Sequence, residues 1–232
     1  MISTYAQWMA EGHEYFLSCV KNISDRELDG PSRLPGWTGW HLLSHVGHNA
    51  RALARLAHWA ATGEQTPMYA SPSARAEEID LGARWPARQL RDFVVTEQDR
   101  LTDALGRIPS GRWQVPVVTA QGRTVPASTI GWLRSREVWI HARDLPSGGD
   151  FPDFPAAFLD ALIDDALERR RATQSLDLDV QATDRSSRPG EGDAQQVLGP
   201  AADLARWLTR GEQSPALHTS TGNPLPQLPP WL

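Results

Sequence analysis

The chain has 232 residues, 40% hydrophobic and 22% charged, which suits one large domain with a smaller one beside it. Its formal net charge of −5 removes the general attraction to phosphate that nucleic-acid-binding proteins use, which argues against DNA or RNA as a partner. A single cysteine, Cys19, excludes an internal disulfide and any zinc site built from several thiolates. The sequence shows neither an apolar run approaching the ~20 residues needed to cross a bilayer nor a signal-peptide pattern, so we expect a cytoplasmic protein without membrane contact.

Hydrophobic periodicity predicts helices through the first two thirds of the chain. Four helical segments are expected, at residues 3–21, 38–61, 71–105 and 127–143. The third is expected to break between 82 and 86, and an extended stretch at 112–125 precedes the fourth. Helices joined by loops in this order are typical of an antiparallel four-helix bundle.

The composition of the sequence changes after Leu145, because glycine and proline cluster between residues 146 and 155. We therefore place a domain boundary between residues 147 and 148. Beyond it we expect helices at 158–171 and 201–208, strands at 176–183, 194–198 and around 217–219, and a polar turn at 185–193. The fold class is thus α+β, with a helical bundle over residues 1–147 and a small α+β domain over 148–232.

Three closely spaced histidines lie in the first half of the second predicted helix: His41, His45 and His48. At roughly 100° per residue they fall within about 60° of one another, so they could contribute to one site. His45 lies nearest the apolar stripe of the helix and therefore nearest the core. A histidine beside an apolar face is often an ordinary core residue, so a metal site requires a second partner.

The fourth predicted helix offers that partner, because Glu137 and His141 lie on one face at i,i+4 spacing, within its apolar stripe. Burying an unpaired carboxylate costs several kcal/mol of folding free energy. The charge of Glu137 must therefore be compensated by a divalent cation or by an ion pair with Arg134 or Arg136. If a divalent cation is bound, it would have three ligands, His45, Glu137 and His141, and one open coordination position. That arrangement is typical of catalytic zinc, and the open position would accept water or a thiolate.

The segments that carry these residues also resemble a known family. They are Leu34-Pro-Gly-Trp-Thr38, Leu42-Leu-Ser-His45, Met68-Tyr69-Ala70-Ser71 with Arg75, Arg136-Glu-Val-Trp-Ile-His141-Ala-Arg-Asp144-Leu145 and the ending LPPWL. They are similar to the mycothiol-dependent maleylpyruvate isomerases, members of the DinB-like superfamily of metal-binding four-helix bundles. The resemblance covers nearly the whole chain.

The resemblance implies a DinB-like bundle in which His45, Glu137 and His141 hold Zn²⁺ or another divalent metal. It also implies that mycothiol is the thiol cofactor and that maleylpyruvate is converted to fumarylpyruvate in gentisate degradation. Reversible thiol addition breaks the double bond so that it can rotate, and metal coordination lowers the pKa of the thiol. Cys19 has no basic neighbour closer than Lys21, so an external thiol is needed.

The resemblance further implies that the C-terminal domain supplies a catalytic arginine, for which Arg210 is expected. The alternative for Arg210 is an arginine placed at a helix C-terminus by the helix dipole. Because maleylpyruvate carries two carboxylates, guanidinium groups are expected to bind it. Arg210 is one candidate and Arg75 a second, with a solvated helix surface as the alternative for Arg75.

Two other functions fit the same residues. A mycothiol S-transferase would share the zinc and the thiol activation but would release a conjugate instead of eliminating the thiol. A metal-free binding or regulatory bundle would use the histidines and Glu137 as an internal polar network.

Overall fold

The structure is a computed structural model that describes residues 2–174, 178–185 and 196–231. The chain divides into two compact units, Met1–Gly149 and Asp150–Leu232. The division falls within the glycine- and proline-rich stretch 146–155.

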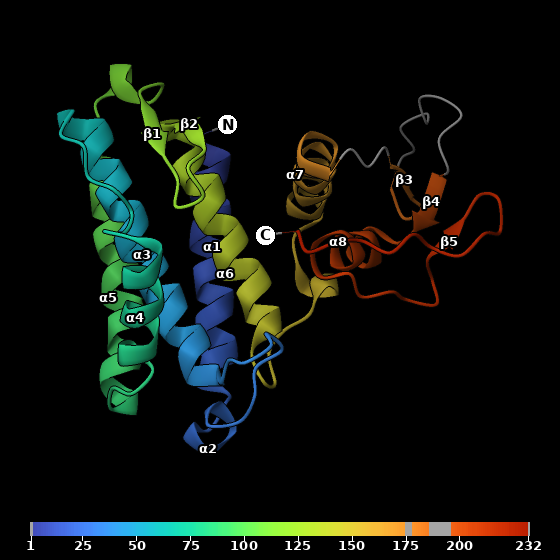
Figure 1. The fold of residues 1–232 in the computed structure, drawn as a ribbon, viewed down its shortest axis with the longest axis horizontal. Coiled ribbons are helices and arrows are strands. Elements are labelled where there is room, and N and C mark those ends of the chain that lie inside the picture. The colour runs from blue at the N-terminus through green and yellow to red at the C-terminus, as the bar shows by residue number, and fades with distance from the viewer. Residues whose placement is uncertain (1, 175–177, 186–195, 232) are drawn as a thin grey trace. The chain divides into compact units, whose positions relative to one another are not determined.

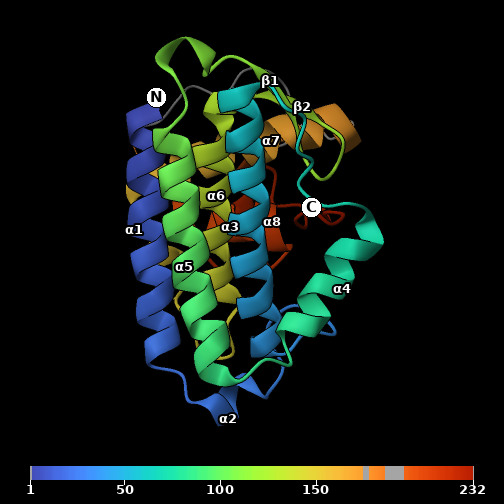
Figure 2. The ribbon, with the colours of Figure 1, turned by 90° about the vertical axis from the view of Figure 1, so that its left-hand side faces the viewer.

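Four long helices build the first unit and lie side by side (Figure 2). They are α1 (Ile2–Lys21), α3 (Gly39–Thr62), α5 (Ala87–Gly106) and α6 (Ile130–Asp144). α3 packs against both α5 and α6, and α1 packs against α6. The predicted four-helix bundle is therefore confirmed.

Shorter elements connect these helices. They are α2 (Asp25–Leu28), α4 (Pro72–Gly82), the 3₁₀ turns Ser110–Arg112 and Ala127–Thr129, and the antiparallel strands β1 (Pro116–Val118) and β2 (Thr124–Pro126). The expected break after residue 82 separates α4 from α5. The expected extended stretch is a hairpin whose turn contains Gly122 at φ 75°. The sequence did not predict α2, because four residues are too few to show periodicity.

The start of α3 is fixed by a capping box. The Thr38 hydroxyl accepts a hydrogen bond from the backbone N–H of His41, and the Thr38 backbone N–H donates to the imidazole of His41. Gly63, at φ 89°, ends the helix in the left-handed conformation that favours glycine. Between these caps, the predicted apolar stripe of α3 is buried, which fixes the direction in which His45 points.

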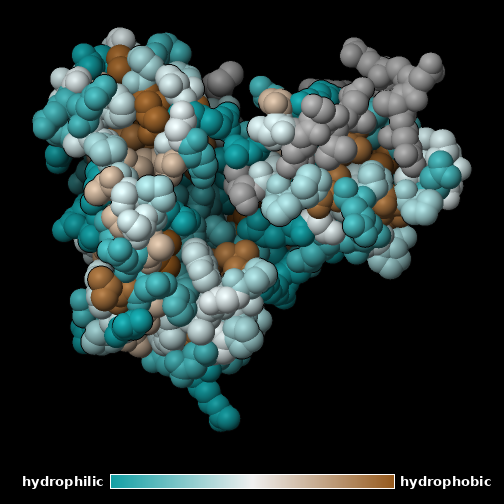
Figure 3. Space-filling model, viewed as in Figure 1, coloured by the Kyte–Doolittle hydropathy of each residue, from teal (hydrophilic) through white to brown (hydrophobic). Residues whose placement is uncertain are grey.

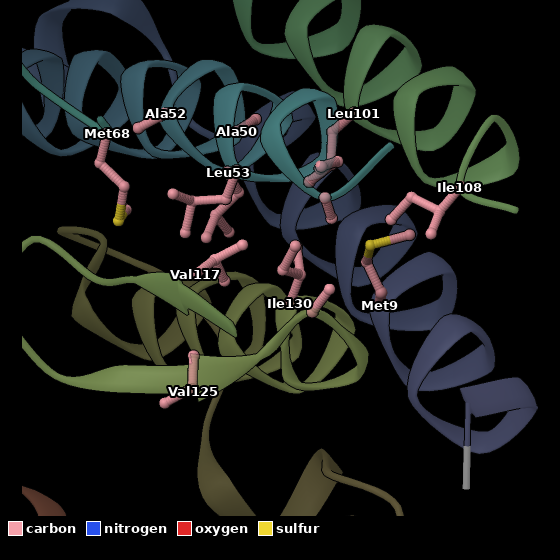
Figure 4. Close-up of a cluster of buried hydrophobic side chains, with 14 residues drawn as sticks. Met9, Ala50, Ala52, Leu53, Met68, Leu101, Ile108, Val117, Val125 and Ile130 are labelled. Carbon is pink, nitrogen blue, oxygen red and sulfur yellow. The ribbon is translucent and has the colours of Figure 1, made fainter. Parts of the chain in front are cut away.

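An apolar cluster holds the bundle helices together at one end (Figure 4). Met9 of α1, Leu53 of α3, Leu101 of α5 and Ile130 of α6 point toward one another there. Each is at most 4% exposed, and burying a side chain of this size contributes roughly 1.5–3 kcal/mol. The cluster thus fixes the register of α3 against α6.

In its described residues, the second unit contains two helices and a small sheet, as predicted for an α+β fold (Figure 1). Its elements are the 3₁₀ turn Phe151–Asp153, α7 (Ala156–Gln174), β3 (Asp179–Ala182), β4 (Gln196–Gly199), α8 (Ala201–Arg210) and β5 (His218–Thr219). β4 lies between the other two strands, parallel to β3 and antiparallel to β5. The first parts of the two strands expected at 176–183 and 194–198, and most of the turn expected at 185–193, lie outside the described residues.

The surface shown in Figure 3 carries its hydrophobic residues in small groups among hydrophilic ones. Among the described residues, the large hydrophobic side chains that stand exposed are Leu81, Val95 and Val118. In the part of the chain that the structure describes, every helix is too short or too polar to span a membrane.

Candidate metal centre

Three side chains converge between α3 and α6. Nε2 of His45 lies 3.0 Å from Oε2 of Glu137 and 3.1 Å from Nε2 of His141. The Glu137 oxygen and Nε2 of His141 are 3.3 Å apart. Packing of α3 on α6 therefore brings together the three residues that the sequence proposed as ligands.

The triangle fits a small divalent cation. A tetrahedral ion with ligands at about 2.0–2.1 Å spaces its ligand atoms about 3.3–3.4 Å apart, close to the observed separations. Two imidazoles and one carboxylate form a donor set found in catalytic zinc sites. The Glu137 side chain is 20% exposed, so solvent reaches one side of the triangle and a fourth ligand has a route to it.

Arg134, which the sequence offered as a partner for Glu137, interacts with that carboxylate electrostatically, but its hydrogen bonds go to neutral groups. Arg134 is fully buried and donates to three neutral acceptors at 2.8–3.0 Å: Oε1 of Gln98, Oδ1 of Asn49 and the backbone oxygen of Val46. The guanidinium of Arg136 lies over the ring of Trp132, 6.0 Å from its centroid. The carboxylate of Glu137 instead contacts the two imidazoles of the triangle.

The protonation states of Glu137 and His45 suit a cation site, whereas His141 must release a proton before it can bind a cation. Burial would raise the pKa of Glu137, but hydrogen bonds from His141 and His45 hold it well below its usual value, so the carboxylate is ionised. Burial lowers the pKa of His45 to about 4, which keeps that imidazole neutral, as a metal ligand must be. Burial also acts to lower the pKa of His141, yet hydrogen bonds with Asp144 and Glu137 raise it above its ordinary value.

Three residues beyond the triangle contact the two imidazoles. Oδ2 of Asp144 lies 2.8 Å from Nδ1 of His141, and a guanidinium nitrogen of Arg75 lies 3.4 Å from Nδ1 of His45. The ring of Trp37 packs against His45, with 5.3 Å between the ring centroids. Sequence reasoning missed the role of Asp144, although its i,i+3 spacing from His141 was a usable signal.

The two other histidines of the cluster on α3 have different partners. His41 belongs to the cap of α3, with Nδ1 2.8 Å from the Thr38 hydroxyl, and His48 lies 3.1 Å from a carboxylate oxygen of Glu78. Arg210 is the last residue of α8, in the second unit, so its part in the site stays a prediction. Gly211 follows it at φ 70° as the glycine cap of that helix.

The fold and the triangle define a class: a helical bundle with a potential metal-binding triad between two of its helices. Residues 9–146 match the family model described as the mycothiol maleylpyruvate isomerase N-terminal domain. This chain belongs to that family. A search of curated proteins finds no match.

Two solved structures are similar over the full length of the chain. The crystal structure of the mycothiol-dependent maleylpyruvate isomerase is 36% identical, with a TM-score of 0.87 over 100% of this chain and 97% of that one. The crystal structure of a histidine-to-alanine mutant of the mycothiol-dependent maleylpyruvate isomerase is 35% identical, with the same TM-score and the same coverage. The bundle and the small second unit thus occur together in both solved chains.

The geometry predicts that His45→Ala loses the metal and stays folded. Removing one of three ligands breaks the chelate, whereas the apolar cluster that holds α3 in place is untouched. Zinc content after loading and desalting measures the loss, and circular dichroism checks the fold. His41→Ala is the matched control, one helical turn away in the cap, and should retain one equivalent. One equivalent of zinc in His45→Ala would reject the triangle as the metal site.

Proposed function

We propose that this protein is a mycothiol-dependent maleylpyruvate isomerase that carries out thiol-assisted cis-to-trans isomerisation at a zinc site. The observation that carries the proposal is the convergence of His45, Glu137 and His141 in a chain that matches this isomerase over its full length. The proposal names Zn²⁺, or another divalent ion, and mycothiol as cofactors, and places the reaction in gentisate degradation in the cytoplasm.

His45, Glu137 and His141 would hold the metal. When bound, it supplies a Lewis acid that lowers the pKa of a coordinated thiol. The anionic carboxylate of Glu137 offsets part of the cation's charge, and the two imidazoles add neutral ligands. The ring of Trp37 lies against His45 at a tilt of 57° and adds an apolar neighbour to that side of the site.

Maleylpyruvate must lose the π character of its double bond before that bond can rotate. Reversible addition of a thiol achieves this, because sulfur forms a single bond to carbon and the electron pair moves toward the conjugated carbonyl oxygen. Elimination after rotation restores the double bond and returns the thiol unchanged. Cys19 belongs to α1, outside the two helices that supply the triangle, which supports an external thiol.

Two arginines are proposed to bind the dicarboxylate substrate. Arg75 reaches the edge of His45 from α4, and its guanidinium lies 6.0 Å from the ring centroid of Tyr69. Burial raises the pKa of Tyr69 to about 12, so its phenol stays neutral beside that cation. We assign Arg75 to one substrate carboxylate and Arg210 to the other, with Arg210 also stabilising the developing negative charge.

The decisive assay follows maleylpyruvate and fumarylpyruvate with and without mycothiol. We expect product only when the thiol is present, with many turnovers for each mycothiol molecule, since elimination regenerates it. Glu137→Gln is the matched control, because it keeps the shape of a metal ligand but removes its charge, and it should be inactive. Stoichiometric loss of mycothiol would instead indicate an S-transferase, and isomerisation without thiol would overturn the proposed chemistry.

Arg210→Ala should retain its zinc and lose turnover by about 100-fold, as expected when a donor to a developing oxyanion is removed. Steady-state kinetics and metal analysis of the same preparation measure both quantities. Arg210→Lys keeps the charge but loses the planar fork, so it should recover only part of the rate. Wild-type kinetics in Arg210→Ala would show that this arginine is not at the site.

A further inference from the structure

The two imidazoles of the triangle have outer partners of opposite charge. Nδ1 of His141 faces the carboxylate of Asp144 at 2.8 Å, within the same helix. Nδ1 of His45 faces the guanidinium of Arg75 at 3.4 Å, across the interface between α3 and α4. Both nitrogens lie on the side of the ring away from the triangle, so each partner acts on the site through its imidazole.

Asp144 lies in a position where an ionised carboxylate is energetically unfavourable. Its side chain is 1% exposed, and it is the last residue of α6, where the negative end of the helix dipole disfavours an acidic group. The N–H of His141 at Nδ1 donates to it and offsets part of this cost. When a cation replaces the proton on Nε2, the same bond keeps the N–H at Nδ1 and the lone pair on Nε2, and makes that nitrogen a stronger donor to the cation.

Arg75 has the opposite effect on His45. A guanidinium has donors and no acceptor, so its contact with Nδ1 requires a lone pair there. The proton of His45 then resides on Nε2 and points at Oε2 of Glu137, 3.0 Å away. Coordination through Nε2 needs the other tautomer, in which N–H at Nδ1 would face the donors of Arg75. The cation and Arg75 therefore compete for the same imidazole, and their positive charges repel.

Polar contacts between α4 and α3 hold Arg75 in this place. The Ser44 hydroxyl donates to the backbone oxygen of Ile79 at 2.8 Å, and His48 lies 3.1 Å from Glu78. Within α4, only Ile79 and Gly82 are buried, so the helix rests on α3 mainly through such contacts. The side chain of Arg75 is therefore positioned without belonging to the apolar core, and replacing it leaves the core intact.

We propose that Asp144 and Arg75 are positioning residues with opposite effects on the metal: Asp144 strengthens His141 as a ligand, and Arg75 weakens His45. The inference rests on the proposed metal site. It also links the metal to substrate binding, because a loaded site removes the acceptor of Arg75 and leaves its donors for a carboxylate. Arg75 would then be available to bind a substrate carboxylate once the metal is bound.

Zinc titration against a chromophoric chelator tests the proposal in the full chain, without an activity assay. Asp144→Asn, which is isosteric, should bind zinc about 10- to 100-fold more weakly than the wild type. Arg75→Met should bind zinc roughly threefold or more tightly, because a repelling cation and a competing donor are removed. Arg88→Met is the charge-matched control, since Arg88 is 94% exposed on α5, and its zinc affinity should stay at the wild-type value.

The thermal unfolding temperatures of the metal-free variants show whether either substitution damages the fold. If Asp144 and Arg75 had only structural roles, both variants would bind zinc more weakly. Unchanged or weaker binding in Arg75→Met, or unchanged binding in Asp144→Asn, would overturn the assignment. A wild-type chain that binds no zinc would overturn the metal site itself, and with it the proposed function. If the wild-type chain binds zinc but the zinc affinities of the two variants do not change in opposite directions, only this inference would be overturned.

Discussion

The carboxylate of Glu137 lies between two helices of the bundle, in contact with two imidazoles. An ionised group in such surroundings needs a compensating charge, and the nearby Arg134 donates its hydrogen bonds to neutral acceptors elsewhere. The neutral His45 and the hydrogen-bonded His141 meet part of that need, and their ring nitrogens are already spaced for a divalent ion. The need to balance this one charge is the physical reason for proposing a cation at the site.

The bundle keeps that charge in place by rigid packing. The apolar cluster at one end fixes α3 against α6, and the buried guanidinium of Arg134 joins both helices to α5 one helical turn from Glu137. The contrast with α4 is informative, because α4 lies on α3 mainly through polar contacts. The three residues of the triangle thus stand on helices packed through apolar side chains, while Arg75 stands on a helix held mainly by polar contacts.

Local spacing made the core of the site predictable from the sequence. The i,i+4 relation of Glu137 and His141 follows from the helical repeat, and the apolar stripe of α3 indicates that His45 points inward. The i,i+3 relation of Asp144 to His141 carries the same kind of information. The contact of Arg75 with His45 could not be predicted, because it depends on how α4 packs against α3, which no local pattern encodes. The pairing order of β3, β4 and β5 is non-local in the same way.

X-ray absorption at the zinc edge tests the central claim most directly. The zinc-loaded protein should show nitrogen and oxygen ligands at about 2.0–2.1 Å, and adding mycothiol should introduce one sulfur at about 2.3 Å. That result would show three side chains holding the ion while a fourth position accepts the thiol. A spectrum that gains no sulfur on adding mycothiol, or a protein that retains no zinc, would contradict the account.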